Sequence, residues 1–367
     1  MGTMLGFGRS RYALEDASSS GRTMATFSPA LAQAPYTAKL FGASRVVSRP
    51  FAAHAPFLDF VVGWGEKPSA LAARSYASRF GVPFVRGEDG FIRSLGLGGS
   101  GDPACSVVLD DRGIYYDATN VSRIENWLNT SEFVVGAAEQ DRARMCIHRI
   151  RRHRLTKYNH TVAEPNLPTV PRPYVLVVDQ TVGDLSVQLG LVPEQAFRGM
   201  LSVALEEHPS AEVLVKTHPE VIAGYKQGYL SGIESGGRVQ LLAEQVNPIA
   251  LLERVQHVYV ATSQLGFEAL MLGKPVSCFG VPFYAGWGLT DDRVEVPRRR
   301  VRRRLEEVFA AAYLHYARYV NPVSGRRCDL ETLIDVIQRL RDAGEGASSV
   351  EKGQALPAGP RAGFQVG

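Results

Sequence analysis

Short apolar runs alternate with amphipathic helical segments along most of this chain. In the first half, the apolar run Phe60–Trp64 is followed by a helical pattern over Ala70–Phe80 and by a second apolar run, Pro83–Arg86. In the second half, the runs Tyr174–Val178 and Glu212–Val215 flank another helical pattern. Short apolar runs are typical of buried strands, and strands that alternate with helices form parallel sheets. The pattern therefore predicts an α/β fold with one parallel sheet in each half of the chain.

A proline-rich segment separates the two halves. Residues 161–173 contain four prolines and no hydrophobic period, which indicates an extended connector. We therefore predict a first Rossmann-type lobe over residues 24–165 and a second over residues 166–342. Two such lobes that face each other across a substrate cleft form the GT-B arrangement. Residues 1–23 are expected to be a flexible extension and residues 343–367 a disordered tail, because both are rich in Gly and Ser and lack periodicity.

The first lobe contains one expected hairpin. Residues Ser106–Leu109 and Ile114–Tyr116 both have the composition of strands, and Asp110–Gly113 between them supplies turn-forming residues. We expect these two strands to pair with each other. Helical patterns over residues 122–128 and 137–153 follow them.

The composition is typical of a folded, mildly basic enzyme. The chain has 367 residues, 45% of them hydrophobic, and a formal net charge of +4, which is too small to predict nucleic-acid binding. Its four cysteines form no C-x-x-C pair, and its histidines lack the spacing of a metal site. No uncharged apolar run reaches the roughly 18 residues of a spanning helix, and residues 1–22 have no apolar signal-peptide core. We expect a cytoplasmic protein with neither metal nor cofactor.

Carboxylates follow one predicted strand in each half. Glu88 and Asp89 come directly after a strand of the first half, and Asp184 lies in a loop after a strand of the second half, together with Gln180. Because open α/β sheets bind their ligands beyond the carboxyl ends of the strands, these groups are candidates for catalysis. Loop aspartates often cap helices, so a capping role for Asp184 is the simpler alternative.

Two further motifs offer groups that bind anions. A cation, a hydroxyl and an imidazole follow one another in Lys216-Thr217-His218-Pro219, and they suit a nucleotide phosphate and base. Thr262-Ser263-Gln264 begins a predicted helix that continues through Glu268, and backbone amides at a helix N-terminus bind anions. The alternatives are a surface lysine, a structural histidine and an ordinary helix cap.

The most prominent charge run is Arg298–Arg304. No aromatic residues lie between its arginines. Proteins that bind single-stranded nucleic acid stack bases on aromatic side chains, so we expect no nucleic-acid partner. Attraction to an anionic membrane surface or to an acidic acceptor is one interpretation of the run, and a solvated face is the other.

Taken in order, these motifs resemble those of the bacterial capsule polysaccharide synthesis family, the retaining β-Kdo glycosyltransferases. In the first half the similar stretches are Gly63-Trp64-Gly65 with Lys67-Pro68-Ser69, residues 88–98, residues 113–118 and Lys157-Tyr158-Asn159. In the second half they are Asp179-Gln180-Thr181 with Gly183-Asp184, residues 216–219, residues 263–270 and residues 282–290. The resemblance extends from Met24 to Leu340.

The resemblance implies a GT-B fold, CMP-β-Kdo as the donor, no metal, and a Kdo-bearing lipid acceptor at the inner face of the cytoplasmic membrane. By resemblance, Asp184 is the nucleophile and Glu88 the acid/base. A covalent adduct on Asp184 that the acceptor hydroxyl then attacks gives net retention. The residues similar to donor-binding positions are Lys216, His218, Pro219, Ser263, Gln264 and Glu268, and further cleft candidates are Asp89, Arg93 and Gln180.

Capsule enzymes of this kind usually carry two such modules, and this chain resembles the first. It contains no second copy of the acidic turn or of Lys-Thr-His-Pro. The expected partners are therefore a second Kdo transferase module or a capsule export complex. The alternatives for function are a transferase of another CMP-activated acid sugar, as in the similar bacterial sialyltransferases, and a non-catalytic module that binds an anionic polymer or membrane. A dinucleotide oxidoreductase is disfavoured, because no G-x-G-x-x-G follows a strand.

Overall fold

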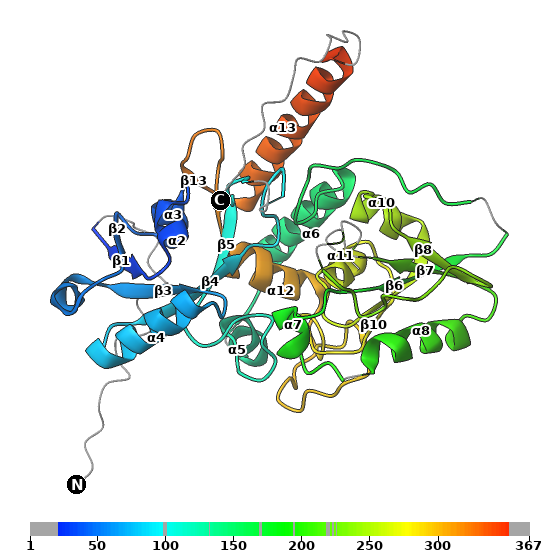
Figure 1. Cartoon of the computed structure of the whole chain (residues 1–367), viewed down its shortest axis with the longest axis horizontal. Coiled ribbons are helices and arrows are strands. Elements are labelled where there is room, and N and C mark those ends of the chain that lie inside the picture. Colours follow the sequence, from blue (N-terminus) through cyan, green and yellow to red (C-terminus); the bar gives the residue numbers. More distant parts are fainter. Residues whose placement is uncertain are drawn as a thin grey trace, which may run out of the picture.

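The protein forms two α/β lobes, each built on its own sheet (Figure 1). The computed structural model describes residues 21–97, 101–131, 133–168, 171–193, 195–217, 221, 224 and 226–351, with side chains as far as residue 344. One sheet is mixed and the other is parallel, and an extended connector joins the two lobes. This arrangement confirms the predicted GT-B-like α/β fold.

The first sheet contains strands from both ends of the chain. In the described residues it has seven strands in the order β13-β12-β5-β4-β3-β1-β2. The strands are β1 Thr23–Thr26, β2 Arg45–Ser48, β3 Phe60–Trp64, β4 Phe84–Asp89, β5 Ser106–Asp110, β12 Ala317–Val320 and β13 Arg327–Cys328. The pairs from β2 to β4 are parallel, whereas β5, β12 and β13 join the sheet antiparallel.

Helices cover both faces of the first sheet because apolar side chains point alternately to the two sides of its strands. Met24 and Val62 pack with the residues of α2 (Pro29–Gln33) and α3 (Thr37–Phe41), whereas Ala25 and Val61 pack with α4 (Pro68–Phe80). A short 3-10 helix, η1 (Ala52–Phe57), connects β2 to β3 on the α4 side.

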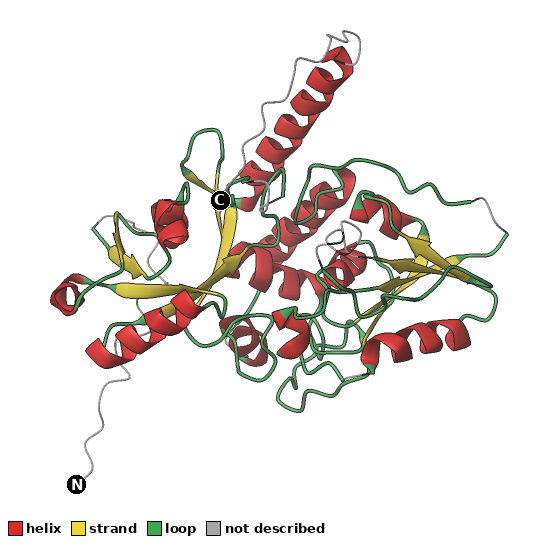
Figure 2. Ribbon diagram, in the orientation of Figure 1, coloured by secondary structure: helices red, strands yellow, loops and turns green. Residues whose placement is uncertain are grey.

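The second sheet is parallel throughout. Within the described residues its six strands have the order β11-β10-β9-β6-β7-β8. They are β6 Tyr174–Val178, β7 Glu212–Lys216, β8 Val239–Leu242, β9 Val255–Val260, β10 Val276–Cys278 and β11 Asp291–Asp292. Helix α8 (Ala196–Glu207) lies on one face, and α10 (Pro248–Glu253) and α11 (Leu265–Met271) lie on the other (Figure 2). Every residue of β6 is buried, as expected for a strand covered on both faces.

One hydrophobic core runs through both lobes. The ring of Phe91 from the first lobe lies 5.0 Å from that of Phe283 and 4.8 Å from that of Tyr313, and Phe283 in turn contacts Phe267 of α11. The elements around this core are α5 (Arg123–Asn129), α6 (Ala137–Arg152), α12 (Leu305–Phe309), the π-helix η3 (Ala310–Tyr316) and α13 (Leu330–Glu351). Helix α13 projects from the body (Figure 1).

The predicted hairpin is wrong. Ile114–Tyr116 is not a strand, because Asp110 Oδ1 accepts hydrogen bonds from the backbone N of Arg112 and of Gly113 and so folds the chain into a turn. The open edge of β5 pairs instead with β12, in a register that places Val108 opposite Ala317. The helices expected over residues 122–128 and 137–153 are confirmed as α5 and α6.

The structure also changes the predicted boundaries. Strands β12 and β13 fall within the predicted second lobe, residues 166–342, yet they belong to the first sheet. Helix α13 continues to Glu351, beyond the start of the predicted tail at residue 343. Residues 1–20 and 352–367 lie outside the described residues. In the part of the chain that the structure describes, no helix is both long and apolar enough to cross a bilayer.

Candidate functional site

Gln180 connects three segments at the carboxyl ends of the second sheet. It follows β6 and is buried. Its side-chain oxygen accepts from the backbone N of Thr262, after β9, at 2.9 Å. Its side-chain nitrogen donates to the hydroxyls of Thr262 at 3.1 Å and of Ser186 at 3.2 Å. Gln180 therefore fixes the loops that carry the candidate catalytic groups, and its own amide is occupied within the protein.

Asp184 caps α7 (Leu185–Gln188), so the simpler of its two predicted roles is confirmed. Its Oδ1 accepts from the backbone N of Ser186 at 2.8 Å, and its Oδ2 lies 3.4 Å from the side-chain nitrogen of Gln180. The cap leaves Oδ2 with one long hydrogen bond on a side chain that is only half-buried. A carboxylate oxygen that is held in place without strong bonding is suited to nucleophilic attack, so the cap does not exclude catalysis.

Glu88 lies at the end of β4 in a confined place. Its Oε1 accepts from the backbone N of Asp89 at 3.0 Å. Its Oε2 faces Gly65, where a Cβ atom would come within 3.2 Å of it. Burial raises the pKa of the Glu88 carboxyl, and the charge of Asp89 adds to this, against the opposing effects of the Asp89 amide and of the Lys157 and Lys67 charges. A carboxyl with a raised pKa is suited to proton transfer near neutral pH.

Tyr115 lies near carboxylates of both lobes. Its pKa is raised well above the usual value, first by burial and then by the charges of Glu88, Asp89 and Asp184, among others. Its ring lies 5.9 Å from that of Phe283, at the junction of the lobes. Glu88 belongs to the first lobe and Asp184 to the second, so carboxylates of both lobes are close enough to this phenol to raise its pKa.

Two cations accompany the carboxylates of the first lobe. Arg93 Nε donates to Asp89 Oδ1 at 2.8 Å, so these two predicted candidates form an ion pair. Burial acts to lower the pKa of Lys157, but the charges of Asp89 and Glu88 outweigh it and the pKa is raised. Lys157 therefore stays protonated beside Glu88. Its part in the site and that of Tyr115 were not predicted, although both lie in stretches that resemble the capsule family.

Lys216 ends β7 as a half-buried cation. Burial lowers the pKa of the Lys216 ammonium. In the described residues no side chain forms an ion pair or hydrogen bond with its ammonium, which leaves it available for an anionic ligand. His218 and Pro219, which were predicted to bind the donor beside it, lie outside the described residues.

The amides at the start of α11 are largely occupied within the protein. The backbone N of Leu265 donates to Ser263 Oγ at 3.3 Å, and that of Gly266 donates to the carbonyl of Ser263 at 3.1 Å. The amide of Thr262 is taken by Gln180. Of the backbone amides predicted to bind an anion, those of Ser263 and Gln264 therefore remain. The side chains of both residues are half-buried.

Gln264 and Glu268 join the two lobes. Gln264 Nε2 donates to the carbonyl oxygen of Phe91 at 2.8 Å and to Glu268 Oε1 at 3.1 Å. The same oxygen of Glu268 accepts from Thr156 Oγ1 at 2.6 Å, and the side chain is buried. Its carboxyl is thus enclosed and bonded within the lobe junction, and the predicted contact of Glu268 with the donor stays a prediction.

Replacement of Glu268 by Gln is expected to remove a pH dependence of stability. Burial raises the pKa of this carboxyl from 4.5 to about 7, against hydrogen bonds from Thr156 and Gln264 that lower it. Because the folded pKa is the higher one, the neutral acid stabilises the fold at low pH, and on the order of 3 kcal/mol is lost as the pH rises to about 7. The free energy of unfolding in urea should therefore shift in favour of Glu268→Gln between about pH 5 and pH 8. A difference between the two proteins that stays constant with pH would contradict this.

The arginine run Arg298–Arg304 is only partly a solvated face. Arg299 is buried, and it donates to Glu125 Oε2 at 3.0 Å and to the carbonyls of Pro282 and Ala285. Arg298 also pairs with Glu125, and Arg303 donates to backbone carbonyls near the end of α5. Only Arg300, Arg302 and Arg304 are exposed. The run therefore ties the second lobe to α5 of the first. Its predicted attraction to an anionic membrane surface or to an acidic acceptor stays a prediction, for which the three exposed arginines remain.

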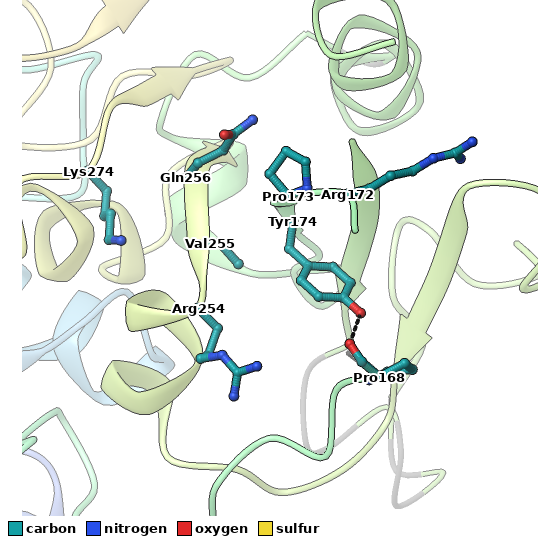
Figure 3. A pocket seen from close by; sticks show the side chains of 8 residues that line it. All are labelled: Pro168, Arg172, Pro173, Tyr174, Arg254, Val255, Gln256 and Lys274. Carbon is teal, nitrogen blue, oxygen red and sulfur yellow. Dashed lines mark hydrogen bonds between the residues drawn. The ribbon is translucent and has the colours of Figure 1, made fainter. Parts of the chain in front are cut away.

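Two cavities lie at the amino ends of the strands, on the side of each sheet opposite to the candidate catalytic groups. One, of about 320 Å³, is formed at the amino ends of β6 and β9 by Tyr174, Arg254 and Lys274 among others, with Tyr174 donating to the carbonyl of Pro168 at 2.7 Å (Figure 3). The other, of about 620 Å³, lies at the amino ends of β1, β3 and β4. Because substrates of such sheets bind at the carboxyl ends, neither cavity is the predicted substrate site. The cleft between the lobes stays a prediction.

The sequence is similar to proteins of capsule biosynthesis. The family model described as capsule polysaccharide biosynthesis protein matches residues 59–327. The capsule polysaccharide modification protein LipA of Neisseria meningitidis serogroup B is 45% identical over 297 residues, which make up 77% of this chain and 42% of LipA. The chain thus spans less than half the length of that relative.

Two solved structures from Thermosulfurimonas dismutans share the fold. The KpsC β-Kdo 2,4 transferase superposes with a TM-score of 0.80 at 42% identity, over 87% of this chain and 98% of that one. The KpsC β-Kdo 2,7 transferase superposes with a TM-score of 0.64 at 28% identity, over 87% and 99%. Since the family model extends from just before β3 into β13, most of the protein is covered, and it belongs to the capsule polysaccharide biosynthesis protein family.

Proposed function

We propose that this protein is a retaining β-Kdo glycosyltransferase that moves Kdo from CMP-β-Kdo to a lipid-linked Kdo acceptor without a metal ion. The similarity to two β-Kdo transferases supports the choice of sugar. Double displacement at an anomeric carbon uses two carboxylates, one as nucleophile and one as acid/base. Glu88 at the end of β4 and Asp184 in the loop after β6 both raise the pKa of Tyr115 at the junction of the lobes, which supports this chemistry. The greater similarity to the 2,4 transferase than to the 2,7 transferase supports a 2,4 linkage.

In the proposed reaction three side chains have roles. Oδ2 of Asp184 bonds to the anomeric carbon of Kdo while the bond from that carbon to the phosphate oxygen of CMP breaks. CMP leaves as an anion, whose charge the unpaired Lys216 offsets. The acceptor hydroxyl then attacks the same carbon, the Asp184 carboxylate is released, and Glu88 takes the hydroxyl proton. Two inversions give net retention.

The setting of the reaction is part of the same proposal. We place it at the inner face of the cytoplasmic membrane, where a lipid-linked acceptor is accessible. LipA is more than twice as long as its region that matches this chain. We therefore also propose that a second transferase module, distinct from the one formed by these residues, extends the product.

The proposal is tested with purified protein, a soluble β-Kdo acceptor and two donors. CMP-Kdo should be consumed and CMP-sialic acid should not, with chelator present throughout. Nuclear magnetic resonance of the product should show a β-Kdo unit bonded to O4. Transfer of sialic acid instead would favour the competing acid-sugar transferase, and consumption of neither donor would contradict the enzyme assignment.

A further inference from the structure

Two phenylalanines stand out from the surface of the first lobe. Phe51 precedes η1 and Phe57 ends it, and their side chains are 74% and 76% exposed. A 3-10 helix has about three residues per turn, so residues 51, 54 and 57 lie on one face of it. The rings of Phe51 and His54 are indeed stacked, 5.8 Å apart. The opposite side of the turn, through Leu58 and Ala55, packs on α4. The outward face is therefore an aromatic stripe.

This aromatic stripe is fixed rather than loose. The hydroxyl of Tyr76 in α4 donates to the carbonyl of Phe51 at 2.7 Å, and the backbone N of Phe51 donates to His54 Nδ1 at 3.0 Å. These contacts hold the backbone at Phe51 in place, so this end of the stripe projects from a fixed part of the chain. Apolar side chains that are exposed together indicate a binding surface more strongly than one exposed side chain does.

The surroundings of the stripe carry one sign of charge. Residues 22–58 include four Lys and Arg residues and no Asp or Glu. Arg49 lies two residues before Phe51, and Arg45 begins β2; both are exposed, and within the described residues neither has an ion-pair partner. Lys39 is also exposed, but α3, which carries it, packs on the opposite face of the sheet. The first acid that follows, Asp59, is bonded to the backbone N of Thr23 at 2.7 Å. A second copy of this chain would bring the same cations against each other, which disfavours self-association here.

The stripe lies at the outer end of the first lobe. In Figure 1, η1 is the short blue turn at the left edge, on the amino side of β3 and away from the second sheet. The cavity of about 620 Å³ at the amino ends of the strands adjoins it through Ala55 and Leu58. Contact with a flat surface at this end leaves the junction of the lobes, with Glu88 and Asp184, open to solvent.

We infer that the aromatic stripe and the cations Arg45 and Arg49 dock this protein on an anionic lipid bilayer. Exposed apolar side chains enter the head-group boundary, and neighbouring Lys and Arg residues are attracted to anionic lipids. The inference depends on this surface alone. It also gives the lipid-linked acceptor of the proposed function a membrane from which to reach the site.

The test is co-sedimentation of the purified full chain with vesicles of phosphatidylglycerol and phosphatidylethanolamine. Binding of Phe51→Ser/Phe57→Ser should fall by about tenfold or more, because it loses two apolar insertions. Arg45→Gln/Arg49→Gln should weaken binding less and reduce its sensitivity to salt. The control, Val134→Ser/Val323→Ser, removes two other side chains that are 75% and 72% exposed, and it should bind as the wild type does.

Several outcomes would overturn the inference. Absence of vesicle binding by the wild type would do so, as would equal binding by Phe51→Ser/Phe57→Ser. So would equal binding of the wild type to purely zwitterionic vesicles, or a dimer of the wild type that the Phe51→Ser/Phe57→Ser exchange dissociates. Transfer to the soluble acceptor should be unchanged in the stripe variant. Loss of vesicle binding with transfer intact therefore separates this inference from the proposed function.

Discussion

Asp184→Asn is expected to abolish transfer of Kdo while leaving the fold intact. An amide oxygen is a poor nucleophile, and removal of a covalent nucleophile lowers rates by about 10⁴-fold or more. Asn caps helices as well as Asp does, and Ser186 needs only an acceptor oxygen 2.8 Å from its amide. The thermal midpoint should therefore change little. Incubation with CMP-Kdo without acceptor should add one Kdo to the wild type, as measured by intact mass, and none to the variant.

The matched control for this variant is Asp329→Asn. Asp329 Oδ1 accepts from the backbone N of Thr332 at 2.9 Å, so it makes the same kind of bond at the start of α13. The exchange removes one capping charge away from the candidate site and should leave transfer unchanged. An Asp184→Asn enzyme that transfers Kdo at the wild-type rate would show that Asp184 acts only as a cap.

The alternation of strands and helices was predictable because it is a local property. Runs such as Tyr174–Val178 are apolar throughout, and the structure buries every residue of this one in a parallel sheet. The pairing of β5 was not predictable in this way. Its partner, β12, comes from the far end of the chain, and the turn residues Asp110–Gly113 do not indicate whether the segment after them returns to the sheet.

The candidate site was predictable in part for the same reason. Parallel sheets collect their ligand-binding groups at the carboxyl ends of their strands. The structure places Glu88 and Lys216 at the ends of β4 and β7, and Asp184 in the loop that follows β6. The burial of Glu268 was not predictable, because its position on a helix says nothing about the Thr156 hydroxyl that bonds it from another part of the chain. Tyr115 was missed because a partly buried phenol carries no signal in the sequence.

The arginine run shows how charge can mislead when burial is unknown. A run of arginines normally faces solvent, because a buried guanidinium needs a partner for its charge and donors. Here Glu125 supplies that partner to Arg298 and Arg299 at once, from a helix of the other lobe. The run and α5 thus hold the two lobes together, so the carboxylates at their junction keep a fixed relation.

That fixed relation makes Glu88→Gln the second variant with a large expected effect. Glu88 must be ionised to accept the proton of the acceptor hydroxyl, and loss of a general base costs about 10²- to 10⁴-fold. Because burial raises its pKa above 4.5, the rate of the wild type should rise with pH through that higher value and then level off. Glu88→Gln should lose this rise and run slowly at all pH values, while the Kdo adduct on Asp184 still forms.

Glu66→Gln serves as the control for Glu88. Glu66 lies one residue after Gly65 and pairs with Arg86 at 2.8 Å, so the exchange alters charge close to the site without removing the proposed base. It should keep both the acid limb of the pH profile and a rate near that of the wild type. If Glu66→Gln and Glu88→Gln lowered the rate equally with unchanged profiles, the effect would be one of local charge, and proton transfer would have to be assigned to another group near Tyr115.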